Sequence, residues 1–156
     1  DVQRAAPAVE AACRATYVAK EELFRRADIV TIHIPYSQKT HHSIGAQEIA
    51  LMKKSAILIH AARGGVLDDA ALVSALRKGA IAGAGLDVFE GEPAIHPGFR
   101  ELKNVVLSPH IASSSEKTRF KMAMKAAENL LAALSSGNPP NLLNPEVKNG
   151  HKTSHG

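Results

Sequence analysis

Four short runs of apolar residues recur along the chain, separated by segments in which apolar positions return every three or four residues. Continuous apolar runs of this length are typical of parallel strands that are buried on both faces, as expected for residues 29–34. The alternation of strand and helix patterns predicts an α/β fold in which crossovers join parallel strands. The predicted strands lie near residues 29–34, 56–60, 82–88 and 105–107.

The helical segments have recognisable starts and stops. Asp68 is suited to cap a helix that presents an apolar face and closes at Gly79, and a longer helix begins at Ser113 to Ser115 and ends at Gly137. Short helices are expected over residues 6–14, 21–27 and 46–52, a brief strand over 16–18, and a loop over 94–100.

The long helix carries one apolar stripe at helical spacing. We expect this stripe to pack into the core rather than to form a groove for a partner. Its members are Phe120, Ala123, Ala127, Leu130 and Leu134.

Three polar motifs follow the last three predicted strands, at residues 61–68, 85–93 and 108–113. Open parallel sheets bind ligands at the carboxyl ends of their strands, so the motifs should meet at one edge. They bring an arginine suited to clamp a carboxylate, an acidic residue, and a histidine that can carry a proton. This set could reduce a keto acid if a hydride donor were present.

The three motifs resemble those of the D-isomer-specific 2-hydroxyacid dehydrogenases, and the resemblance extends from the first residues to about Pro145. It implies hydride transfer between NAD(H) and a small 2-hydroxy or 2-keto acid, without identifying which acid. Arg63 would bind the substrate carboxylate, and His110 would protonate the keto oxygen. Glu92, which directly precedes a proline as the family's acidic residue does, would hold the imidazole; Glu90 is expected to face solvent.

The resemblance also assigns residues to the cofactor. Asp1 would bind the ribose hydroxyls and favour NAD over NADP; the alternative is a surface aspartate at a ragged terminus. The other cofactor positions that it implies are Pro35, Thr40, Ala61, Ala62, Arg63, Asp87, His110 and Ser113.

No G-x-G-x-x-G turn occurs in this sequence, although dinucleotide-binding domains use one to hold the pyrophosphate. The expected fold is therefore an incomplete Rossmann-type NAD-binding domain, its second half plus a C-terminal helix. Residues 1–137 would form this portion, and residues 138–156 a tail that returns toward an absent substrate domain. The last residues, 148–156, are polar and are expected to be disordered.

Other interpretations remain open. Some relatives of this fold act as corepressors that sense dinucleotide, and an inactive fragment is a third possibility. His96 is an alternative to His110 as the proton carrier, but only because it is also a histidine. His60 stands where the family usually has Asn. We expect no metal site: His41 and His42 are adjacent in sequence, so their side chains should not converge, and no carboxylate accompanies them.

Composition excludes several classes of function. Nineteen basic against fifteen acidic residues give a net charge of +4, and no basic block is interleaved with aromatics, so nucleic-acid binding is not expected. No apolar run approaches the roughly 18 residues of a membrane span. The lone Cys13 fits a reducing compartment, and cytoplasm is the expected location. The resemblance implies a homodimer for the full-length form.

Overall fold

The computed structural model describes residues 4–146, and these fall into two compact units that divide between Ala112 and Ser113. The predicted boundary at residue 137 differs from this division, because it lies inside the second unit, and it stays a prediction. The tail over residues 148–156, expected to be disordered, lies outside the described residues.

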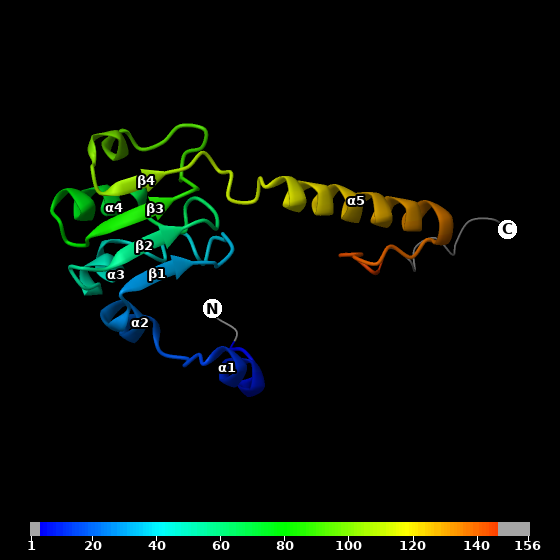
Figure 1. Cartoon of the computed structure of the whole chain (residues 1–156), viewed down its shortest axis with the longest axis horizontal. Coiled ribbons are helices and arrows are strands. Elements are labelled where there is room, and N and C mark those ends of the chain that lie inside the picture. The colour runs from blue at the N-terminus through cyan, green and yellow to red at the C-terminus, as the bar shows by residue number, and fades with distance from the viewer. Residues whose placement is uncertain (1–3, 147–156) are drawn as a thin grey trace. The chain divides into compact units, whose positions relative to one another are not determined.

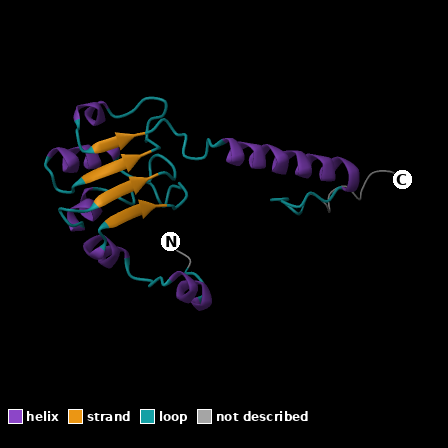
Figure 2. Ribbon diagram, in the orientation of Figure 1, coloured by secondary structure: helices purple, strands orange, loops and turns teal. Residues whose placement is uncertain are grey.

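The first unit is built on a four-stranded parallel sheet in the order β1-β2-β3-β4 (Figures 1 and 2). The strands are β1 (Ile29–Ile32), β2 (Ile57–His60), β3 (Gly83–Leu86) and β4 (Val105–Leu107). Ile32 pairs with His60, and His60 with Leu86, so the strands end in register at one edge. The predicted α/β fold with parallel strands is confirmed. β4 has its predicted bounds, and the other three strands are shorter than predicted.

Short helices connect these strands. They are α1 (Pro7–Cys13), α2 (Lys20–Arg26), α3 (Ala46–Leu51) and α4 (Asp69–Arg77), with a 3₁₀ helix, η1 (Pro97–Glu101), before β4. Asp68 caps α4 as predicted, because its carboxylate accepts a hydrogen bond from the amide of Ala71 at 2.9 Å. The main core lies between the helices and one face of the sheet, and includes Phe24, Leu58, Leu72, Leu76 and Phe99.

Three local expectations are wrong. β1 was expected to be buried on both faces, but its side chains alternate between buried and exposed, and Ile29 is 65% exposed. Val106 on β4 is similarly exposed, at 73%. Figure 2 shows α3 and α4 on one side of the sheet. Residues 16–18 form no strand, and the expected loop over residues 94–100 contains the start of η1.

The second unit contains α5 (Glu116–Ser136), which Ser115 caps and which ends at Gly137 in the left-handed conformation, φ +66°. The expectation that its apolar stripe is buried is wrong for the described structure: Phe120 is 66% and Leu134 78% exposed. The helical pattern indicated a face to be covered, but it could not indicate which element would cover it.

The chain after α5 turns back along the helix (Figure 1). The backbone amide of Asn141 donates to Oδ1 of Asn129 at 2.9 Å. In return, the side-chain Nδ2 of Asn129 donates to Oδ1 of Asn141 at 3.1 Å. These bonds hold the described part of the tail to its own unit. Between residues 4 and 146, no helix combines the length and apolar character that a bilayer crossing demands.

Candidate active site

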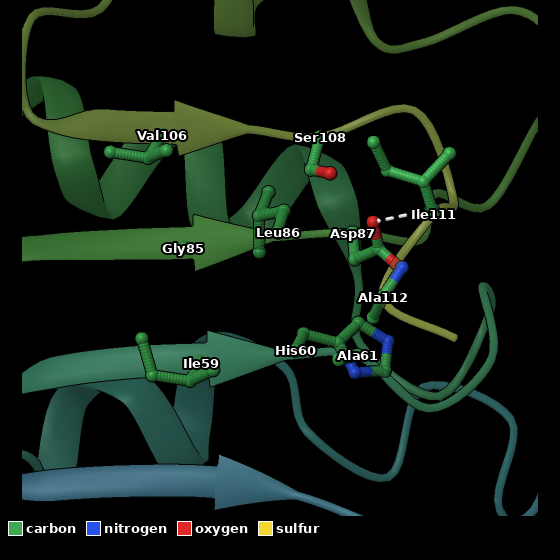
Figure 3. Close-up of a pocket in the computed structure, with 10 residues that line it drawn as sticks. All are labelled: Ile59, His60, Ala61, Gly85, Leu86, Asp87, Val106, Ser108, Ile111 and Ala112. Atoms are coloured by element: carbon green, nitrogen blue, oxygen red, sulfur yellow. Dashed lines mark hydrogen bonds between the residues drawn. The ribbon is translucent and has the colours of Figure 1, made fainter. Parts of the chain in front are cut away.

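The three polar motifs do meet at one edge of the first unit. β2, β3 and β4 run parallel, so the loops that leave them at residues 61, 87 and 108 begin side by side (Figure 3). This edge is where an open parallel sheet binds its ligands.

His110 and Glu92 are directly paired. Nδ1 of His110 lies 2.7 Å from Oε2 of Glu92, and the other carboxylate oxygen accepts the amide of Phe89 at 2.9 Å. The hydrogen bond from His110 is the main cause that lowers the pKa of the Glu92 carboxyl below its usual value. An ionised carboxylate can only accept, so Nδ1 of His110 carries the proton in this pair. Nε2 of the ring is then the nitrogen available to a substrate.

Asp87 fixes the backbone that follows His110. Its two carboxylate oxygens accept the amides of Ile111 at 2.8 Å and Ala112 at 2.9 Å, and Figure 3 shows the side chain turned toward this loop. Burial alone would raise the pKa of Asp87, but the hydrogen bonds from Ala112 and Ile111 outweigh it, and the pKa is lowered. His110 itself has a φ of +55°, which is uncommon for a residue other than glycine. Asp87 thus stabilises the unusual turn that presents His110.

Arg63 lies on an exposed loop after β2. Its guanidinium donates to the carbonyl of Ala62 at 2.7 Å, and among the described residues it forms no ion pair. The next residue, Gly64, packs so closely on the carbonyl of Phe89 that a Cβ there would overlap it. The loop with Arg63 therefore rests on the loop that leads to Glu92, and its charge is available for an anion.

The remaining predicted cofactor positions lie in different parts of the structure. The hydroxyl of Thr40 accepts the Ser37 amide at 2.7 Å and donates to the Pro35 carbonyl at 2.8 Å, which closes the loop after β1. Ala62 packs against the core, and Ser113 is the exposed first residue of the second unit. Asp1 lies outside the described residues.

Two pockets open at this edge. One, of about 280 Å³, lies between the ends of β2 and β3 (Figure 3), and its lining includes Ile59, His60, Ala61, Gly85, Asp87 and Ala112. The other, of about 400 Å³, is lined by Phe89, Glu92, Pro93, Ile95, Pro109 and His110. Small and apolar walls with a few polar groups are typical of small-molecule and cofactor sites.

His60 is a site residue to which the sequence assigned no role. It is 1% exposed, lines the first pocket, and neither ring nitrogen has a well-formed hydrogen bond. Burial lowers its pKa, and the nearby backbone of Arg63 offsets part of this shift. The available signal was a polar residue at the end of an apolar run. The apolar wall of this pocket, together with the carboxylate of Asp87, fits a flat polar heterocycle such as nicotinamide.

The structure also corrects our expectation for His41 and His42. Their rings are stacked, with centroids 3.9 Å apart and planes at 21°, so the side chains do converge. A carboxylate does accompany them, because Oε1 of Glu90 lies 2.8 Å from Nε2 of His42. Glu90 is partly exposed, as expected, but it is paired rather than simply solvated. Both reasons for dismissing a metal site are therefore wrong.

Known proteins resemble this chain in both sequence and fold. Residues 1–112 match the family described as D-isomer specific 2-hydroxyacid dehydrogenase, NAD binding domain. The chain is 51% identical to a glyoxylate reductase of Aeropyrum pernix over 141 residues, which are 89% of this chain and 42% of that protein.

Solved structures give the same result. A glyoxylate reductase from Paecilomyes thermophila superposes with a TM-score of 0.84 at 33% identity, covering 94% of this chain and 44% of that one. An NAD-complexed D-isomer specific 2-hydroxyacid dehydrogenase from Lactobacillus delbrueckii ssp. bulgaricus superposes with a TM-score of 0.82 at 33% identity, covering 92% and 47%.

The parallel sheet and the ligand edge define a Rossmann-type dinucleotide-binding domain, of which this chain contains a part. The chain belongs to the D-isomer specific 2-hydroxyacid dehydrogenase family. It spans about two-fifths of the length of the glyoxylate reductase it matches, 42%.

Proposed function

We propose that this chain is the catalytic half of the cofactor domain of a dehydrogenase that interconverts small 2-keto and D-2-hydroxy acids. Bound NAD(H) would supply or accept the hydride. The observation that carries the proposal is the His110–Glu92 pair, 2.7 Å apart. It lies at the same sheet edge as Arg63, which forms no ion pair within residues 4–146. The family membership supports the same chemistry.

Each side chain has a distinct task in this proposal. Arg63 binds the substrate carboxylate through its planar guanidinium, which can donate two parallel hydrogen bonds. His110 donates a proton from Nε2 to the keto oxygen during reduction and takes it back during oxidation. Glu92 stabilises the ring when it is charged and fixes which nitrogen faces the substrate.

The residues proposed to hold the nicotinamide end line the pocket between β2 and β3. Ala61 and Gly85 leave room for a flat ring, and Asp87 supplies acceptors whose remaining lone pairs can meet an amide. Pro35 and Thr40 lie on the neighbouring loop, and Ala62, Arg63, His110 and Ser113 complete the proposed set. Asp1 would select NAD by repelling the 2′-phosphate of NADP.

A direct assay tests the function. The full-length protein should oxidise NADH when a small 2-keto acid is added, with glyoxylate tested first because related proteins carry that activity in their names. Dinucleotide binding without turnover on any keto acid would favour a dinucleotide sensor instead. Failure to bind dinucleotide would contradict both.

The organisation of the complete protein is also proposed. Residues 1–137 would belong to the cofactor domain, and residues 138–156 would lead toward a substrate domain. We further propose that the complete protein is a homodimer. We also propose that it resides in the cytoplasm, which agrees with its single, exposed cysteine. The modest net charge of +4 agrees with the proposal that it binds no nucleic acid. Light scattering on the full-length protein tests the dimer.

A further inference from the structure

Two adjacent histidines converge because of an unusual backbone conformation. Side chains of neighbouring residues normally point in different directions. His42 has a φ of +47°, in the left-handed region, and its amide donates to the carbonyl of Gly65 at 2.8 Å. This turn stacks the ring of His41 on that of His42, with centroids 3.9 Å apart. A left-handed residue other than glycine costs about 1 kcal/mol or more, and such strain concentrates at functional sites.

A carboxylate from a distant part of the chain completes the cluster. Glu90 follows β3, 48 residues beyond His42, and its Oε1 lies 2.8 Å from Nε2 of His42. The backbone amide of Glu90 donates to Oδ2 of the buried Asp69 at 3.1 Å, which fixes the loop from beneath. The backbone that carries the third side chain is therefore held by a contact that is independent of the histidines.

We propose that His41, His42 and Glu90 form a binding site for a divalent transition-metal ion of the zinc type. One potential ligand atom from each residue lies within 4.8 Å of the other two. Tetrahedral Zn²⁺ with bonds of about 2.0–2.1 Å needs ligand atoms roughly 3.3 Å apart. The side chains are at least partly exposed, so a shift of this size is open to them. The proposal does not depend on the proposed function.

The donor set selects the class of ion. Two imidazoles and one carboxylate suit Zn²⁺, Ni²⁺ or Cu²⁺, whereas Mg²⁺ and Ca²⁺ prefer oxygen ligands. Three protein ligands leave a fourth position for water or another small ligand. Bound metal would replace the hydrogen bond between His42 and Glu90.

The ion would join two loops of the candidate active site without using its proposed catalytic residues. His41 and His42 follow Thr40 directly, and Glu90 lies two residues before Glu92. A metal bridge would therefore tie the loop after β1 to the loop after β3. Because the ion binds the folded chain, it should raise the thermal stability of the protein.

Zinc titration of the full-length protein tests the proposal. His151 and His155 lie outside the described residues and could bind metal themselves, so both are replaced by Gln in every protein used. Calorimetry with ZnCl₂ after chelator treatment should show one ion per chain with micromolar affinity, and MgCl₂ should show none. Zn²⁺ should also raise the melting temperature.

Single replacements then locate the ion. His41→Gln and Glu90→Gln should each weaken Zn²⁺ binding by roughly tenfold or more and reduce the zinc-dependent rise in melting temperature. His33→Gln is the matched control, because His33 is an exposed loop histidine that contacts Thr31. Circular dichroism without metal checks that each variant is folded; should one be unfolded, the other decides.

The proposal is overturned if no saturable Zn²⁺ binding occurs. It is equally overturned if the folded His41→Gln and Glu90→Gln variants bind as the parent does, or if His110→Gln abolishes binding while they do not.

Discussion

Nδ1 of His110 donates to the carboxylate of Glu92 at 2.7 Å, although 18 residues separate them in the sequence. The contact forms because the loops after β3 and β4 leave neighbouring strands at the same edge. It fixes the proton on Nδ1 and leaves Nε2 for the substrate, which is the arrangement that a reversible proton donor requires.

The Glu92–His110 contact should make stability depend on pH in a defined window. The pKa of Glu92 is lowered in the folded protein, chiefly by the hydrogen bond from His110. A lowered carboxyl pKa adds stability above the unfolded-state pKa, near 4.5, and that stability is lost as pH falls through the folded-state pKa. Melting temperatures of the parent should exceed those of Glu92→Gln at pH 6, and the gap should close in acid.

The matched control for this prediction is Glu22→Gln, which removes an exposed ion pair between neighbouring turns of α2. Its melting curve should follow the parent closely, because exposed pairs contribute about 0–1 kcal/mol. A gap for Glu92→Gln that stays constant below pH 4 would show that the carboxylate charge is not responsible.

Asp87→Asn should loosen the turn that presents His110. The two backbone amides donate to different oxygens of Asp87, so asparagine would turn its NH₂ group, which can only donate, toward one of them. We expect a loss of about 1–3 kcal/mol in the free energy of unfolding, because one backbone amide loses its acceptor and the largely buried side chain at position 87 loses a partner. Urea denaturation measures it.

Asp28→Asn is the comparison for Asp87→Asn, since Asp28 is exposed and pairs only with Lys53 among the described residues. It should change stability by less than about 1 kcal/mol. Equal effects of the two substitutions would contradict the role given to Asp87.

Arg63→Lys should act mainly on substrate binding. Lysine keeps the positive charge but cannot reproduce the two parallel hydrogen bonds of a guanidinium to a carboxylate. The KM for a 2-keto acid should rise more than kcat falls, and by a larger factor than the KM for NADH, because Arg63 is proposed to bind the substrate carboxylate through both hydrogen bonds. Steady-state kinetics over a range of keto acid concentrations measures this, with Arg77→Lys as the control because Arg77 pairs with Glu101.

Parts of this structure could be predicted because local chemistry determines them. The apolar runs and the caps at Asp68 and Gly137 gave the parallel strands and the helix ends, since both depend on residues close in sequence. One topological rule, that parallel strands end at a common edge, predicted that the loops carrying His110 and Glu92 meet. The choice of Glu92 over Glu90, and of His110 over His96, came from the family resemblance.

Other parts depend on contacts that no local pattern contains. The stacking of His41 on His42 requires a left-handed residue, and the approach of Glu90 requires a loop anchored on Asp69, 21 residues away. The exposed face at Ile29 has the same apolar composition as a buried one. Sequence periodicity predicts which residues favour burial, but not which partner covers them.

The central claim is that His110 transfers the proton in the reduction of a 2-keto acid. The most direct measurement is kcat for NADH-dependent keto acid reduction by the full-length protein and its His110→Gln variant. General acid catalysis contributes about 10²–10⁴-fold, so kcat should fall by that factor, while NADH still binds. His96→Gln, which alters a histidine on the neighbouring loop, should retain most of the activity. Parent-like turnover by His110→Gln, or its loss in His96→Gln alone, would contradict the account.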